Sequence, residues 1–295
     1  MTLNITVAAR WLMAQSSDFR LTVPGGTVSE TSQKQVVLQY MGWSGLVCYT
    51  GVARYGSHDT ATWLADVLTH DPGQRSPEQV VNQLIEEATV WLRRVPLRSR
   101  FHTFTMITYE RGKPHVYVVS NYQRPNGPQL ASPADNLFLT RRRPRGPRCI
   151  VTGYSPAVLD PQCEALEELL ASNPSVERLR EAVAATSRES STRAEGTVGE
   201  SCVVAHLCPD GSGEAQVFGN LSEEFLPTMI TNGHNVASLV PLVMDQAGRS
   251  DPHRLVGATW SANGAATAMV GAYRALSQQA GSGWPPSTSS ASGDK

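Results

Sequence analysis

The chain has 295 residues, of which 40% are hydrophobic and 17% charged, and its formal net charge at pH 7 is −1. This apolar content is sufficient for a folded core, and the composition is not that of a disordered chain. A net charge so close to zero gives no general attraction to nucleic acid or anionic lipid, so we expect neither as a partner. The length predicts one large domain, or one domain with an appendage.

The cysteines and apolar segments indicate a reduced, cytoplasmic protein. The five cysteines form no CxxC pair and leave an odd thiol, which favours a reducing compartment. No apolar run approaches the roughly 18 residues that span a bilayer, so we expect no membrane association. The apolar stretch 5–14 is interrupted by Arg10 and lacks a preceding basic segment, and we therefore do not expect a signal peptide.

The first fifty residues have the pattern of strands. Residues 2–9 alternate apolar and polar side chains, and residues 11–14 follow as a second short strand. Pro24-Gly25-Gly26 predicts a turn. Residues 35–40 and 46–50 then form a predicted hairpin.

Two helices are predicted next. Residues 58–69 carry apolar side chains on one face. The second helix begins at Ser76, where Pro77 takes the first helical position and Gln79 completes a capping box. Its apolar stripe consists of Val80, Val81, Leu84, Ile85, Ala88, Trp91 and Leu92.

The alternation of strands and paired helices continues along the chain. Strands are predicted at 103–109, 114–120, 137–140 and 148–152, helices at 162–171 and 175–187, and a final hairpin at 201–207 and 214–218. Blocks in this order suggest helices packed on the outer faces of two stacked sheets. The predicted fold class is therefore α+β, as a four-layer αββα sandwich.

These elements occupy residues 1–220, which we interpret as one domain. Residues 221–277 are assigned as a C-terminal extension, in which 233–248 and 256–276 each have a pattern compatible with a helix. Residues 278–295 are rich in Ser, Gly and Pro and are predicted to be a disordered tail.

The most informative pattern is formed by Thr2, Asp18 and Lys34, which follow one another at intervals of 16 residues. Met aminopeptidase usually removes a Met that precedes a residue as small as Thr, so we expect a mature chain that begins at Thr2. An N-terminal Thr combines a hydroxyl nucleophile with a free amine that can act as its base. That amine has a reference pKa of about 7.7–8.0, which suits proton transfer near neutral pH. A buried Lys nearby would promote deprotonation, and an Asp would keep the Lys charged.

At these residues the chain resembles a proteasome β-type subunit, which is an N-terminal-nucleophile (Ntn) hydrolase. The resemblance rests on Thr2-Leu-Asn-Ile-Thr-Val-Ala, on Ser17-Asp18-Phe19-Arg20-Leu21-Thr22 and on Lys34, and extends to about residue 220. Counted from Thr2, the Thr, Asp, Arg and Lys have the spacing of catalytic subunits, and the family fold is the αββα sandwich. The alternative is a hairpin that opens an ordinary sandwich, with Lys34 at a solvated edge.

The resemblance implies a role for each residue. Thr2 Oγ would attack a substrate carbonyl while its own amine accepts the proton, and Asp18 would hold the positively charged Lys34. Gly51 is the candidate whose backbone N–H stabilises the oxyanion, and the alternative for it is an ordinary strand-end turn. The interval from Lys34 to Gly51 is about three residues longer than in the family, and we assign the surplus to the hairpin tip at 40–45.

By the same resemblance, an extended peptide would bind between two strand edges. These edges are Leu21–Val23, which includes Thr22, and Gly51–Ala53. Leu21, Val36 and Tyr49 would line the pocket for the side chain before the scissile bond. This lining is apolar, which would favour a hydrophobic residue there.

Two supporting segments depart from the family pattern. Where the family has a supporting Ser after the central strands, Thr152 or Ser155 is the candidate here. Where the family has Asp-x-x-Ser-Gly-Gly, this chain offers Glu195 and Thr197 as imperfect substitutes. In the family these groups hold the N-terminus in place, so the departures bear on efficiency more than on fold.

The remaining motifs predict neither a metal nor a cofactor. The seven His show no ligand spacing, and there is no P-loop or GxGxxG. Cys48 and Cys202 lie in apolar strands and are interpreted as core residues. The segment 141–148 contains five Arg in eight residues, and we interpret it as a solvated loop, with a nucleic-acid or acidic-partner patch as the alternative.

The sequence thus predicts a threonine peptidase or amidohydrolase that needs no cofactor. The resemblance further implies a ring-like homo-oligomer. Two alternatives stay open. The first is a non-catalytic scaffold or assembly subunit, as proteasome α-type subunits are, which the altered supporting segments favour. The second is an acylase of the same superfamily that acts on a small amide.

Overall fold

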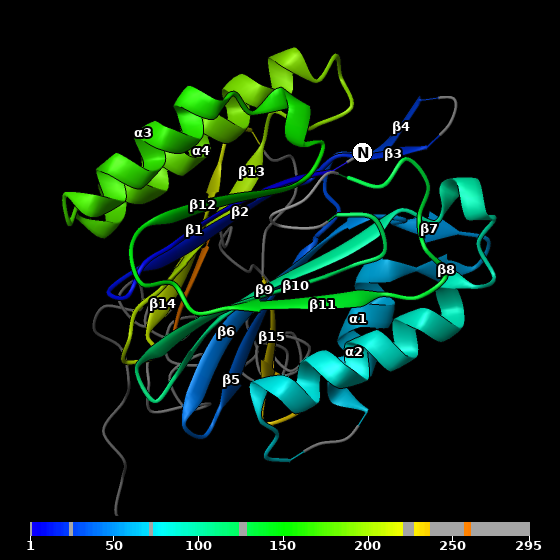
Figure 1. Ribbon diagram of the computed structural model, residues 1–295, viewed down its shortest axis with the longest axis horizontal. Coiled ribbons are helices and arrows are strands. Elements are labelled where there is room, and N and C mark those ends of the chain that lie inside the picture. The colour runs from blue at the N-terminus through cyan, green and yellow to red at the C-terminus, as the bar shows by residue number, and fades with distance from the viewer. Residues whose placement is uncertain are drawn as a thin grey trace, which may run out of the picture.

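The computed structural model describes residues 2–23, 26–70, 73–123, 129–220, 227–236 and 257–260. In this part of the chain, two large β-sheets lie against each other and four α-helices cover them (Figure 1). The protein therefore belongs to the mixed α+β class, as predicted. None of the described helices is long and apolar enough to cross a membrane.

The first sheet has six strands in the order β12-β1-β2-β13-β14-β17, and all its pairings are antiparallel. Its strands are β1 (Leu3–Ala8), β2 (Met13–Asp18), β12 (Arg148–Gly153), β13 (Cys202–Leu207), β14 (Gly213–Phe218) and β17 (Gly257–Trp260). Strand β1 lies between β12 and β2, so Leu3 is opposite Gly153. The start of β1 is thereby fixed from both sides.

The second sheet has seven strands in the order β11-β10-β9-β6-β5-β15-β16. Its strands are β5 (Gln35–Tyr40), β6 (Trp43–Gly51), β9 (His102–Glu110), β10 (Lys113–Ser120), β11 (Phe138–Arg142), β15 (Thr228–Thr231) and β16 (His234–Asn235). Only the β15–β5 pair among these is parallel. Two short hairpins are separate from both sheets: β3 (Leu21–Val23) with β4 (Gly26–Ser29), and β7 (Arg54–Tyr55) with β8 (His58–Asp59).

The helices begin and end at recognisable signals. They are α1 (Thr60–Thr69), α2 (Pro77–Leu92), α3 (Asp160–Ala171) and α4 (Val176–Arg193), with short 3₁₀ turns η1 (Leu97–Ser99) and η2 (Ser155–Ala157). The predicted capping box of α2 is confirmed: Ser76 accepts from the Gln79 backbone N–H, and the Gln79 side chain accepts from the Ser76 N–H. At the start of α1, the Asp59 side chain accepts from the Thr62 backbone N–H.

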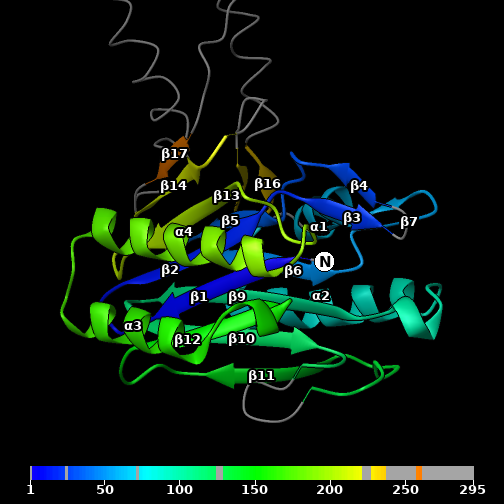
Figure 2. The same cartoon turned by 90° about the horizontal axis from the view of Figure 1, so that it is seen from above.

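Three apolar clusters hold these elements together. One joins α1 and α2 to the seven-stranded sheet, and includes Leu84 and Val47. A second joins α3 and α4 to the six-stranded sheet, and includes Val183 and Val204. The third lies between the two sheets around Leu46. Figure 2 shows α3 and α4 lying along β12, β1 and β13, where contacts between these elements are also found.

The structure corrects the expected C-terminal helices where it describes them. Residues 234–235 form β16 and residues 257–260 form β17, and β15 adds a further strand to the second sheet. Open edges of β5 and β14 supply backbone partners there, and this pairing outweighs a weak helical pattern. The rest of 221–277, the predicted tail 278–295 and the Pro24–Gly25 part of the predicted turn lie outside the described residues.

Other predicted boundaries also differ: α1 begins at Thr60 rather than at residue 58, α4 continues to Arg193 rather than ending at 187, and two strand regions are longer than predicted. The second strand begins at Met13 rather than at residue 11 and continues to Asp18, so that Asp18 ends a strand. The arginine-rich segment is only partly a loop, because Arg141 and Arg142 belong to β11 and Arg148 begins β12. In both cases pairing with a neighbouring strand extends the element beyond its apolar residues.

Candidate functional site

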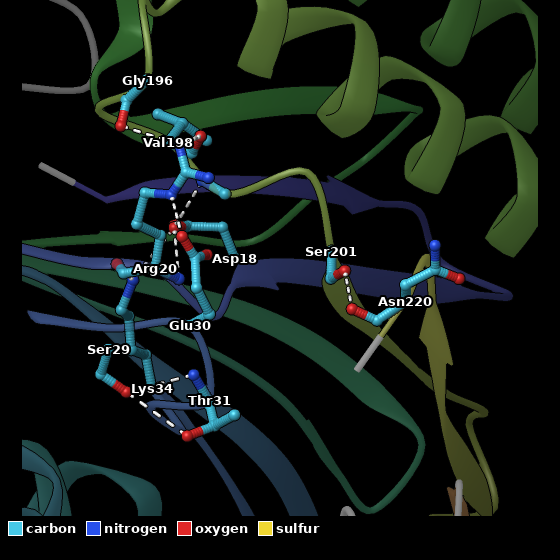
Figure 3. A network of polar contacts seen from close by, with 11 residues as sticks. Asp18, Arg20, Ser29, Glu30, Thr31, Lys34, Gly196, Val198, Ser201 and Asn220 are labelled. Carbon is cyan, nitrogen blue, oxygen red and sulfur yellow. Dashed lines mark hydrogen bonds and ion pairs between the residues drawn. The ribbon is translucent and has the colours of Figure 1, made fainter. Parts of the chain in front are cut away.

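The carboxylate of Asp18 collects four donors at the end of β2. Its Oδ1 accepts from the Leu3 backbone N–H at 2.9 Å, and its Oδ2 accepts from Lys34 Nζ at 3.1 Å. The backbone N–H groups of Arg20 and Gly199 donate to the same Oδ2, each at 3.1 Å. Figure 3 shows Asp18, Arg20 and Lys34 grouped in this network. One carboxylate therefore holds both the lysine and the residue that follows the predicted nucleophile.

Lys34 is a buried lysine, with 1% of its surface exposed. Besides Asp18, its Nζ contacts the carbonyl oxygen of Arg20. Burial lowers the pKa of Lys34 below its ordinary value, and the neighbouring Asp18 carboxylate opposes this shift. Desolvation is the larger effect, so the ammonium holds its proton less tightly than a surface lysine does. Such a group is suited to a site where protons move.

Thr2 lies where the ends of three strands meet, and a hydrogen bond to its carbonyl group fixes its position. The Thr2 carbonyl oxygen accepts from the Tyr154 N–H at 2.9 Å. Gly153, with φ +87°, approaches so closely that a Cβ there would lie 1.9 Å from this oxygen and 2.9 Å from Thr50 Cγ2. Thr2 is 3% exposed. The start of β1, the end of β12 and the end of β6 thus converge on this residue.

Gly51 ends β6 in a conformation that glycine favours. Its φ is +104°, and a Cβ would lie 1.9 Å from the Phe101 carbonyl oxygen. The Tyr49 N–H donates to the Lys34 carbonyl at 3.1 Å, and the Val52 N–H donates to Phe101 on the opposite side at 3.2 Å. Because successive N–H groups of a strand alternate in direction, the Gly51 N–H points to the Lys34 side. The predicted oxyanion donor therefore faces the segment that carries the buried lysine.

The side chain of Gln123 binds both backbone groups of Gly153, a role that was not predicted from the sequence. Its Oε1 accepts from the Gly153 N–H at 3.2 Å, and its Nε2 donates to the Gly153 carbonyl at 3.4 Å. Thr103 Oγ1 donates to the same Oε1 at 3.0 Å. A lone Gln after a strand gives no sequence signal for this role, which depends on two chain segments meeting.

The predicted substrate-binding residues are only partly brought together. Val36 and Tyr49 pack in the same core cluster beneath α1 and α2. Leu21 is buried in the separate β3–β4 hairpin, where Thr22 pairs with Thr27.

The second predicted strand edge is partly occupied by the protein itself. The carbonyls of Val52 and Ala53 both accept from Thr60, at 2.7 and 2.9 Å. The Val52 N–H is also used, because it donates to Phe101. Part of the predicted edge 51–53 is therefore already hydrogen-bonded, because helix α1 begins beside it.

Arg20 ties the site to the segment after α4. Its guanidinium donates to Glu30 at 2.8 Å and to the carbonyls of Gly196 and Val198 at 2.8 and 3.3 Å (Figure 3). Together with the Gly199 N–H on Asp18, these contacts bring the backbone of 196–199 into the site.

Three of the four expected supporting side chains have partners of their own, and the fourth is exposed. Thr152 Oγ1 bonds to Thr105, and Ser155 Oγ accepts from Gln129. Thr197 Oγ1 donates to the Ala194 carbonyl at the end of α4, and Glu195 is exposed. Their supporting role stays a prediction, and the backbone of 196–199 contributes to the network directly. Backbone donors leave no residue-type signal, which is why the sequence did not reveal Gly199.

No known family model matches this chain, and no curated protein matches it. The described residues contain no cluster of three His, Cys, Asp or Glu that would hold a metal ion. The arrangement brings together a buried Thr, a buried ammonium, a carboxylate that binds both segments, and a backbone N–H at the end of β6.

Proposed function

We propose that this protein is an Ntn-type threonine hydrolase that cleaves peptide or other amide bonds with Thr2 as its nucleophile. The observation that carries the proposal is the Asp18 carboxylate, which binds Lys34 and the Leu3 N–H at the same time. An ion pair that served only to stabilise the fold would not require the contact with Leu3, the residue next to the proposed nucleophile. The order of helices, sheet, sheet and helices supports the proposal that the fold is the four-layer αββα sandwich of this superfamily.

In the proposed reaction, Thr2 Oγ attacks the carbonyl carbon and the Thr2 amine, once free, accepts the hydroxyl proton. Lys34 supplies positive charge beside the nucleophile, and Asp18 positions Lys34. The Gly51 N–H stabilises the oxyanion of the tetrahedral intermediate. The amine then returns the proton to the leaving group, and water hydrolyses the acyl-enzyme. Cytoplasmic localisation and a ring-like homo-oligomer stay predictions of the sequence and its resemblance.

One observation favours the second candidate function, hydrolysis of a small amide. An extended peptide pairs with a strand edge through backbone hydrogen bonds. The carbonyls of Val52 and Ala53, which would accept such bonds, already accept from Thr60. A short substrate needs only the reacting carbonyl and one flanking group to be bound.

The decisive experiment is the intact mass of the purified protein before and after treatment with a peptide epoxyketone. This warhead closes a ring with both the hydroxyl and the amine of an N-terminal Thr. We expect loss of Met1 and one adduct, and we expect Thr2→Ala to abolish both adduct and amide hydrolysis with an unchanged Tm. A folded protein that retains Met1, or that starts at Thr2 and neither forms an adduct nor hydrolyses short amides, contradicts the enzyme proposal and leaves the scaffold alternative.

Substrate length separates the two hydrolase candidates. Peptide amides of one to six residues with the same fluorogenic leaving group are compared by kcat/KM. A value that rises with length supports a peptidase that uses the strand edges. A value that is highest for the shortest substrates supports a small-amide hydrolase.

A further inference from the structure

A cavity of about 1180 Å³ opens between the edge strands of the two sheets, and Thr2 is not among its lining residues. It lies between β11 and β12 and is bounded by the connection 143–147, which is the green segment that joins these two strands in Figure 1. Its wall contains Arg142, Arg143, Arg145 and Arg148. Four of the five arginines of the segment 141–148 therefore line this one cavity.

The positive charge of this cavity is largely uncompensated within the described part of the chain. No described carboxylate is within ion-pair distance of Arg142, Arg143 or Arg145, and Arg148 reaches Glu167 only at 3.6 Å. Arg142 Nη2 is buried and has no acceptor among the described residues. Asp160 is the acidic residue of the lining. The exposed guanidinium groups of Arg143 and Arg145, by contrast, are accessible to an anionic ligand.

A neighbouring cavity continues the basic surface. It measures about 650 Å³, shares Arg143 and Arg145 with the first, and adds Arg10 and Lys113. Arg10 follows β1 and Lys113 begins β10, so residues from both sheets contribute. Basic residues from separate parts of the chain therefore form one continuous surface, whereas the sequence predicted a solvated loop at 141–148.

The floor of the larger cavity is apolar. The half-buried Ile150 and Val151 of β12 line it, and the buried Val116 and Val118 of β10 lie beneath. The volume is somewhat larger than the roughly 300–1,000 Å³ of typical small-molecule sites. Guanidinium groups bind phosphate through paired N–H donors, and the apolar floor suits an uncharged organic part. None of the lining residues is aromatic, so the stacking platform typical of single-stranded nucleic acid is missing from this lining.

We propose that this cavity is a binding site for a small organic phosphate, with its phosphate groups on Arg142, Arg143 and Arg145 and its uncharged part on Ile150 and Val151. The inner wall includes Gln123, which clamps Gly153 from the side opposite Thr2. The site is therefore separate from the nucleophile. The proposal holds whether or not Thr2 is catalytic.

The test is isothermal titration of the full-length protein with three probes: ATP, pyrophosphate and adenosine. We expect ATP to bind, pyrophosphate to bind more weakly, and adenosine to give no measurable heat. Arg142→Gln and the double variant Arg143→Gln/Arg145→Gln should each weaken ATP binding by about tenfold or more. The matched control is Arg98→Gln/Arg178→Gln, which removes the same charge at two exposed arginines and should leave binding unchanged.

Three results would overturn the proposal. The first is no binding of ATP or pyrophosphate to the wild-type protein at low ionic strength. The second is ATP binding that the cavity variants and the control variant weaken equally, which indicates a general charge effect. The third is binding of an RNA oligonucleotide that is tighter than ATP and equally sensitive to the cavity variants, which assigns the surface to nucleic acid.

Discussion

Burial of the charged pair Lys34 and Asp18 disfavours folding through the loss of hydration. Both side chains are 0% exposed, and the desolvation of two buried charges can exceed their mutual attraction. Apolar side chains of the same size would stabilise the protein equally well or better. The four donors on Asp18 reduce the cost, but their positions also fix Leu3, Arg20 and Gly199 around one point. At the scale of the residue, the pair is thus better explained by its positioning of these backbone groups than by a contribution to stability.

His102 gives a residue-scale prediction about pH. Its ring is fully buried beside Tyr49, Trp91 and Phe104, and neither ring nitrogen has a hydrogen-bond partner among the described residues. Burial, with a smaller repulsion from His58, lowers the pKa of His102 to about 3. The unfolded chain therefore takes up this proton first as the pH falls. Stability that is present above pH ~6.5 is lost progressively toward pH ~3.

We expect His102→Phe to remove this loss. At about pH 4.5 the wild type should have lost roughly 3 kcal/mol through this group relative to neutral pH, and the variant should not. Urea unfolding at both pH values measures the difference. His70→Phe, at an exposed histidine, is the control and should follow the wild type. Parallel pH profiles for His102→Phe and the wild type would show that the buried ring does not govern acid stability.

At the scale of the element, the sequence predicts those parts whose signals are local. Helix α2 was located from its capping box and apolar stripe, because both signals lie within the helix. Strands β15 and β17 were missed, because their stability comes from the edges of β5 and β14, which are far away in the chain. The site divides in the same way: Asp18 and Lys34 were predictable from side-chain type and spacing, whereas Gln123 and the Gly199 N–H act through tertiary contact.

The end of strand β12 offers an element-scale test of how the fold positions Thr2. Replacing a glycine of positive φ by alanine ordinarily destabilises a protein by about 1 kcal/mol. We expect Gly153→Ala to destabilise this protein by considerably more. The added Cβ would collide with the Thr2 carbonyl oxygen, so epoxyketone labelling should also slow. Gly112→Ala is the matched control, since Gly112 also has positive φ (+73°) but its Cβ would meet only Pro209 O at 3.7 Å.

Chemical denaturation and the rate of adduct formation measure these two effects. Gly112→Ala should carry only the conformational cost and label at the wild-type rate. If both glycine variants lose the same stability and label equally fast, the close approach of β12 to Thr2 has no consequence for the site.

At the scale of the whole molecule, the chain beyond residue 220 completes both sheets. Strand β15 pairs in parallel with β5, next to the segment that carries Lys34, and β17 pairs with β14. Met229 and Trp260 are buried in the cluster between the sheets, and Ile230 is buried in the cluster beneath α1 and α2. The described part of the predicted extension therefore contributes to two of the three cores.

Truncation tests this conclusion. A chain ending at residue 220 would lose Met229, Ile230 and Trp260 from the core, and the burial of each such side chain contributes about 2–3 kcal/mol. Their sum is on the order of the total stability of a typical domain, about 5–15 kcal/mol. We therefore expect this chain to lose its cooperative thermal transition and its near-UV circular dichroism. A chain ending at residue 277 keeps all described strands and should melt at the wild-type temperature. A cooperative transition at the wild-type Tm in the 220-residue chain would instead show that residues 1–220 fold as an independent domain.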